Sequence, residues 1–215
     1  MEHLEIAYDL LVIMIGLAAL SIVVFWAART GEAELRDFGI LYACFTLVLV
    51  VVLLEKYLFL NVADYSARAW YALSGVDELL SFAVIVAGIH FFAGVYGVQH
   101  RMAITAGFAG LALVCILLVL LPSGAALDAE ARTIHFGPAF RVSALGYFVA
   151  FTVMLALGVA AVRKQWQTER RNFLIGLLIF AGIGYLETSL SLPEAMHQTE
   201  VTLSQSGGFL YSSIP

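Results

Sequence analysis

Charged residues are scarce in this chain, at 13% of 215 residues, whereas hydrophobic residues make up 62%. Soluble globular proteins carry about 25% charged and about 45–50% apolar residues. The shortage of charge extends along the whole chain, and the mean hydropathy is +0.94. This composition excludes a soluble enzyme and indicates that the lipid bilayer is the main solvent of the protein.

Cysteine is also rare, and the two cysteines, Cys44 and Cys115, lie in apolar runs. Such thiols usually behave as small hydrophobic groups, so a disulfide scaffold is excluded. The two positions differ in depth by roughly 10 Å along their predicted spans. Both are therefore predicted to remain free thiols, because a disulfide needs Cα atoms within about 7 Å.

A helix that crosses a bilayer needs roughly 20 apolar residues, and six runs of the chain meet this length. The sequence predicts an all-α polytopic membrane helix bundle that forms a single integral membrane domain over residues 1–215. The predicted spans are residues 6–28, 38–60, 75–97, 102–122, 142–162 and 172–192. The first run is too long, and its flank too acidic, for a cleaved secretory signal.

The connections between the spans are short, except for residues 123–141, which are predicted to form an aqueous loop. Residues 193–208 are polar, and residues 209–215 become apolar again. The apolar end predicts the start of a truncated seventh helix, so that the chain would be an N-terminal fragment. The alternative is a frayed external tail.

Arginine and lysine near span ends are retained in the cytoplasm, and their distribution predicts the orientation. With the N-terminus outside, seven basic residues lie on the inner side and four on the outer side. The sequence therefore predicts an external N-terminus.

Several ionisable residues lie close to the ends of the apolar runs and do not need to be inside the membrane. Asp9, Glu55 and Lys56 lie near span ends, where they can reach the headgroups. Ser74 and Asp77 have the spacing of a capping box, which predicts that the third helix begins there and that Asp77 and Glu78 stabilise its N-terminus.

Two ionisable residues remain inside predicted spans, His90 near the middle of the third and Glu187 in the outer part of the sixth. For His90 the alternatives are a hydrogen bond to a neighbouring helix and a role in binding a ligand or a proton. For Glu187 they are an ion pair with Lys56 or Arg141 and a protonated acid in a signal pocket. These four residues are the candidate ligand-binding residues.

No motif for catalysis or for a cofactor is present. His3, His135 and His197 are predicted on the outer side but lack the spacing of metal ligands. The sequence therefore predicts no enzyme activity, no cofactor and no metal site. Small residues of three spans are predicted to mark helix contacts. They are Ala93 and Gly97 in the third span, Ala103, Ala106, Gly107 and Gly110 in the fourth, and Gly176, Gly182 and Gly184 in the sixth.

Residues 168–180, with the sequence TERRNFLIGLLIF, and residues 213–215, SIP, resemble the last two spans of one family. It comprises bacterial membrane-anchored regulators with a seven-helix sensor region and a C-terminal LuxR-type helix-turn-helix. Residues 88–94, GIHFFAG, are similar to a Phe-His pattern of the same group. The resemblance implies a sensory module in the bacterial inner membrane that couples a signal to a cytoplasmic output domain outside this chain.

Three other functions remain open: the input region of a histidine kinase, a small transporter, and a subunit of a larger membrane complex. The expected partners are the lipid bilayer and a small-molecule ligand from the outer side. A homodimer is compatible with this interpretation, and contact with nucleic acid is not expected from this segment.

Overall fold

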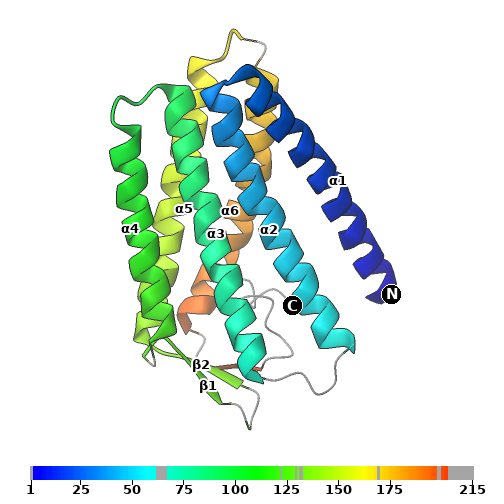
Figure 1. The fold of residues 1–215 in the computed structure, drawn as a ribbon. Coiled ribbons are helices and arrows are strands. Elements are labelled where there is room, and N and C mark those ends of the chain that lie inside the picture. Colours follow the sequence, from blue (N-terminus) through cyan, green and yellow to red (C-terminus); the bar gives the residue numbers. More distant parts are fainter. Residues whose placement is uncertain are drawn as a thin grey trace.

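The computed structural model describes residues 2–61, 67–121, 123–128, 130, 133–168, 170–197 and 200–202. The described helices are α1 (Glu2–Thr30), α2 (Ala33–Asn61), α3 (Ala67–Tyr96), α4 (Arg101–Leu120), α5 (Pro138–Lys164) and α6 (Arg171–His197). Each of these six described helices contains a stretch long and apolar enough to cross a membrane, which confirms the all-α polytopic bundle. Successive helices run in opposite directions (Figure 1).

Helix α3 lies at the centre of the bundle and packs against α2, α4 and α5. Its side chains Phe82, Ile85, Ile89 and Phe92 are fully buried. Their spacing of three to four residues places them on one side of the helix. Helix α1 packs against α2 at the edge of the bundle and slants away from it toward its N-terminus (Figure 1).

The start of α3 differs from the prediction. The helix begins at Ala67, so the proposed capping box at Ser74 and Asp77 is wrong: both residues lie inside the helix and are buried. The additional N-terminal turns are anchored by Tyr71, whose hydroxyl donates a hydrogen bond of 2.7 Å to the carbonyl of Ala125. Because of this contact with a distant segment, the helix begins earlier in the chain than the local motif predicted.

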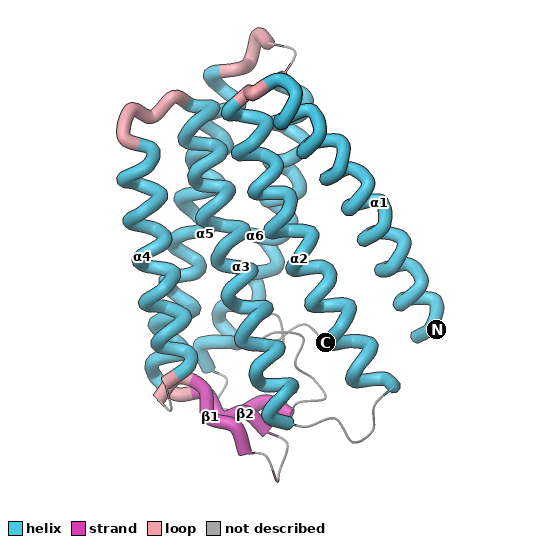
Figure 2. The backbone as a smooth tube through the Cα atoms, viewed as in Figure 1, coloured by secondary structure: helices cyan, strands magenta, loops and turns pink. Residues whose placement is uncertain are grey.

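The connection between α4 and α5 is also more ordered than the predicted aqueous loop. Strands β1 (Ala125–Asp128) and β2 (Thr133–Phe136) form an antiparallel hairpin, and β3 (Glu200–Thr202) adds to β2. Ile134 is fully buried, and the ring of Phe136 stacks on Phe140 at 4.2 Å between centroids. The hairpin therefore packs against the end of the bundle (Figure 2).

The opposite end of the bundle carries the tight turns from α1 to α2 and from α3 to α4 (Figure 2). Gly31 and Gly97 have φ angles of +69° and +81°, which side chains rarely tolerate. The N–H of Gly97 donates to the carbonyl of Ala93 at the end of α3. These turns bring the first residues of α2 and α4 to the last turns of α1 and α3. We call this end, predicted to be cytoplasmic, the inner end, and the hairpin end the outer end.

The small residues contribute to packing differently from the prediction. A Cβ atom added to Gly107, Gly110, Gly176 or Gly182 would meet nothing within 4 Å, so these glycines mark no helix contact. Gly184 does approach the ring of Phe151. Close contacts between helices lie on the central helices α3 and α5, at Gly88 against Met154, at Gly146 against Cys115 and at Gly158 against Leu178. The predicted contact residue Ala93 of α3 is fully buried.

Both cysteines are free thiols, Cys44 on α2 and Cys115 on α4. Helix α6 continues through Pro193 to His197. Residues 209–215, the predicted start of a seventh helix, lie outside the part of the chain that the structure describes.

Candidate functional site

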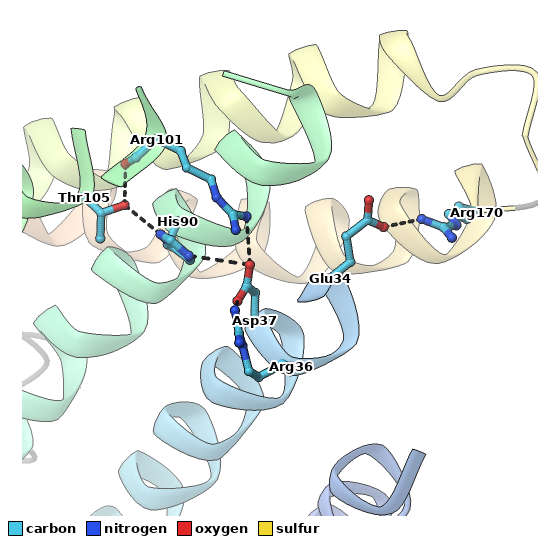
Figure 3. Close-up of polar contacts among 7 residues, drawn as sticks. All are labelled: Glu34, Arg36, Asp37, His90, Arg101, Thr105 and Arg170. Carbon is cyan, nitrogen blue, oxygen red and sulfur yellow. Dashed lines mark hydrogen bonds and ion pairs between the residues drawn. The ribbon is translucent and has the colours of Figure 1, made fainter. Parts of the chain in front are cut away.

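Five polar residues meet at the inner end of the bundle, and we call them the inner cluster: Arg36, Asp37, His90, Arg101 and Thr105 (Figure 3). They come from the first turns of α2 and α4 and from the last two turns of α3. Asp37 is the centre of the cluster, with only 3% of its side chain exposed. A carboxylate this deeply buried needs charged or hydrogen-bonding partners.

The carboxylate of Asp37 faces three basic side chains. Arg101 Nη1 donates a hydrogen bond of 2.9 Å to Asp37 Oδ2, and His90 Nε2 lies 3.5 Å from the same oxygen. Arg36 Nη2 lies 3.6 Å from Oδ1. The contacts tie together helices α2, α3 and α4.

Thr105 determines how His90 is oriented. The Thr105 hydroxyl donates its only proton to the carbonyl of Arg101 at 2.9 Å. It therefore accepts from His90 Nδ1, which lies 2.9 Å away. The other ring nitrogen, Nε2, faces Asp37, so the imidazole of His90 bridges Thr105 of α4 and Asp37 of α2.

Gly94 leaves the space through which Arg101 reaches Asp37. A Cβ atom at this position would lie 2.5 Å from Arg101 Nη1. Nearby, the more exposed pair of Glu34 and Arg170 links α2 to the residue just before α6. Among its described residues, the inner end therefore holds one buried ion-pair network and one peripheral ion pair.

The predicted candidate His90 belongs to the inner cluster. It lies six residues before the end of α3, or roughly 9 Å, so it is nearer the inner end than the predicted midplane. Its bond to Thr105 agrees with the alternative of a hydrogen bond to a neighbouring helix. The structure does not test its role in binding a ligand.

The other candidates do not form a described site with His90. The side chains of Lys56 and Glu187 lie outside the described part of the structure, so their ion pair stays a prediction. Arg141 lies in the first turn of α5, and its buried Nε atom has no hydrogen-bond partner among the described residues.

A second polar group lies toward the outer end, and we call it the outer cluster: Asp77 and Glu78 of α3, Cys115 of α4 and Ser143 of α5. The side chain of Cys115 lies near those of Ser143 and Glu78. Asp77 is only 1% exposed. Within the described residues, Asp77 Oδ1 and Ser143 Oγ have no hydrogen-bond partner.

Buried polar atoms without a partner cost about 1–3 kcal/mol each, so natural proteins usually retain them for water, a proton or a ligand. The described residues of this cluster, like those elsewhere, do not form a group of three or more metal-ligating side chains. The carboxyl and hydroxyl groups of the outer cluster can hold a polar organic ligand or a proton.

An apolar layer separates the two clusters. Phe82, Ile85 and Ile89 of α3 are each at most 2% exposed. The ring of Phe82 packs edge-on against Tyr147 of α5, with 5.1 Å between centroids. Along the described part of α3, no continuous polar route joins Asp77 to His90.

Comparison of the chain with protein-family models, curated proteins and solved structures finds no match. The function is therefore inferred from the two clusters themselves. Their side chains can bind, hold a proton or exchange ion-pair partners.

Proposed function

We propose that this bundle is the membrane-embedded sensory domain of a signalling protein, in which a signal reaching the outer cluster changes the ion pairing of the inner cluster. The observation that carries the proposal is the buried carboxylate of Asp37, which joins three helices at the inner end. A predicted cytoplasmic output domain would be controlled from this end.

Helix α3 supplies the mechanical link between the two clusters. Asp77 and His90 lie thirteen residues apart on this continuous helix, or roughly 20 Å. A small rotation or shift of α3 at the outer cluster would move His90 relative to Asp37 and Thr105. Packed helices shift between discrete arrangements rather than deform smoothly. The sensor would therefore have two states, which differ in the ion pairs of the inner cluster.

The ligand would act by binding one of these states more tightly. A bound ligand can shift the equilibrium only by its difference in affinity for the two states. The partnerless atoms of Asp77 and Ser143 would supply that difference, because a polar ligand satisfies them only in the state that presents them together.

The apolar layer favours sensing over transport. A transported solute needs polar groups or water along its path, whereas Phe82 and Ile85 fill the interior between the clusters. The resemblance to LuxR-type regulators favours a transcriptional output, and a histidine kinase input region remains the alternative within the same class.

The test uses the complete gene product in its host cell. Strains carrying Asp37→Asn, Asp77→Asn or the control Glu34→Gln would be compared by transcript sequencing and by phosphorylation of response regulators. We expect Asp37→Asn to fix the output in one state, Asp77→Asn to abolish the response to growth conditions, and Glu34→Gln to behave as wild type. Unchanged outputs in all three strains would contradict the proposal.

A second measurement addresses transport directly. Proteoliposomes that contain the chain would be screened for proton and solute flux. We expect no flux above that of empty vesicles. Flux that Asp77→Asn abolishes would replace the sensory function with transport.

A further inference from the structure

A groove between α1 and α2 at the inner end has a polar end and an apolar body. Its volume is about 450 Å³. The polar end is formed by Gly31, Glu32 and Arg36, and the body by small and aliphatic side chains such as Ala27, Ala28 and Ala43. The groove lies where two predicted spans meet the membrane surface, so its apolar body faces lipid chains and its polar end faces headgroups.

Glu32 and Arg36 present opposite charges at this end without pairing with each other. Glu32 directly precedes α2, and its carbonyl accepts a hydrogen bond of 3.1 Å from the N–H of Arg36, so the two residues are close enough for an ion pair to be feasible. Among the described residues, however, Glu32 forms no ion pair, and Arg36 is 66% exposed and reaches only the edge of Asp37. Both charges are thus open to a ligand in the groove.

We infer that the groove binds a phospholipid with a primary ammonium headgroup, of the phosphatidylethanolamine class. The Arg36 guanidinium would donate to the phosphate, as guanidinium groups do with good geometry. The Glu32 carboxylate would accept from the ammonium. The acyl chains would cover the apolar body over the alanines of α1 and α2.

Two further features support this occupant. The first turn of α2, which begins at Ala33, lies at the polar end of the groove between the lining residues Glu32 and Arg36, and its partial positive charge favours a phosphate. The carboxylate of Glu32 disfavours a purely anionic headgroup such as phosphatidylglycerol, which would meet it with like charge. A quaternary ammonium, as in phosphatidylcholine, has no N–H to donate to Glu32.

Lipid binding would also reach the inner cluster through Arg36. This side chain lines the groove and is one of the three basic groups around Asp37. A phosphate that holds Arg36 would leave Asp37 to Arg101 and His90. The inference stands on the groove alone and does not depend on the proposed sensory function.

Trp26, half-exposed on α1 and next to the groove residue Ala27, provides the probe. The chain with Trp70→Phe and Trp166→Phe would retain Trp26 as its single tryptophan. It would be reconstituted in phosphatidylcholine vesicles with added brominated phosphatidylethanolamine, phosphatidylcholine or phosphatidylglycerol. Quenching of Trp26 by bromine then measures the relative association constant of each lipid.

We expect the ethanolamine lipid to bind about fivefold more tightly than the choline lipid, as one net ion-pair contact would provide. Glu32→Gln and Arg36→Gln should each reduce this preference to less than about twofold. Ala28→Leu should remove it by filling the groove while both charges remain. Glu34→Gln, a nearby carboxylate outside the groove, is the matched control and should keep the preference.

Each other outcome counts against the inference. Equal quenching by the three lipids would show ordinary bilayer contact only. Stronger quenching by phosphatidylglycerol would show that Arg36 acts without Glu32. Protection of Trp26 from all three lipids would indicate that a second copy of the chain covers the groove. A loss of preference in Glu34→Gln equal to that in Glu32→Gln would show a general charge effect.

Discussion

Arg101 Nη1 and Asp37 Oδ2 lie 2.9 Å apart although the two residues are 64 positions apart in the sequence. Each comes from the first turns of a helix that follows a tight glycine turn. The pair therefore fixes the relative positions of α2 and α4, which the connecting turns alone would leave free to separate.

Asp37→Asn should destabilise the bundle by about 2–5 kcal/mol, because removal of one partner leaves the buried part of Arg101 uncompensated. Reversible unfolding in mixed micelles measures the change. Glu34→Gln, which breaks the exposed pair with Arg170, is the matched control and should cost about 0–1 kcal/mol. An equal decrease in the free energy of unfolding in the two variants would show that burial does not strengthen the ion pairs of Asp37.

Gly94→Ala should displace Arg101 from Asp37, since the new Cβ would lie 2.5 Å from Arg101 Nη1. We expect the free energy of unfolding to fall by about 1–3 kcal/mol, because the added methyl group overpacks this site. Gly107→Ala introduces the same methyl group on α4 where nothing lies within 4 Å. This control should be neutral or stabilising by up to about 1 kcal/mol, because alanine favours a helix more than glycine does. If Gly107→Ala were less stable than Gly94→Ala, the position of Arg101 beside Gly94 would be contradicted.

Tyr71→Phe should loosen the hairpin of β1 and β2 from the bundle. The variant loses the hydroxyl that donates to the Ala125 carbonyl, at an expected cost of about 0.5–1.5 kcal/mol. Hydrogen exchange should rise in residues 123–128 and in the first turns of α3, whereas the inner end should be unaffected. Unchanged exchange in the hairpin would mean that this bond does not anchor it.

The orientation can be measured by labelling with an impermeant thiol reagent in intact cells. In a background with Cys44→Ala and Cys115→Ala, single cysteines would replace Thr30 or Gln167 on the inner side and Ser123 or Gln198 on the outer side. We expect labelling of the outer pair alone, because the inner side carries seven of the eleven basic residues. Labelling at Thr30 or Gln167 before lysis would reverse the topology.

The spans could be predicted because lipid imposes a length and an apolar composition that each run satisfies independently of its neighbours. The start of α3 could not, because Asp77 and Glu78 resemble helix-capping acids locally and only the tertiary fold buries them. Likewise, glycine can face lipid or a neighbouring helix. Gly107 and Gly158 have similar surroundings in the sequence, and only the packing of α5 distinguishes them.

The inner cluster was only partly predictable. His90 stands out as an ionisable residue in an apolar run, whereas Asp37 and Arg101 look like ordinary charges in short connections. A usable signal was present: both lie within a turn or two of glycine turns that share one end of the bundle. Their contact still depends on the approach of α2 to α4 across α3, which no local pattern encodes.

The apolar layer of Phe82, Ile85 and Ile89 also bears on the effect of a membrane potential. These side chains are buried and uncharged, and they lie between Asp77 and His90 along α3. Moving one charge through the full potential involves about 2.3 kcal/mol per 100 mV. A shift of the helices that carried a charged side chain of either cluster along the membrane normal would therefore depend on the energisation of the membrane.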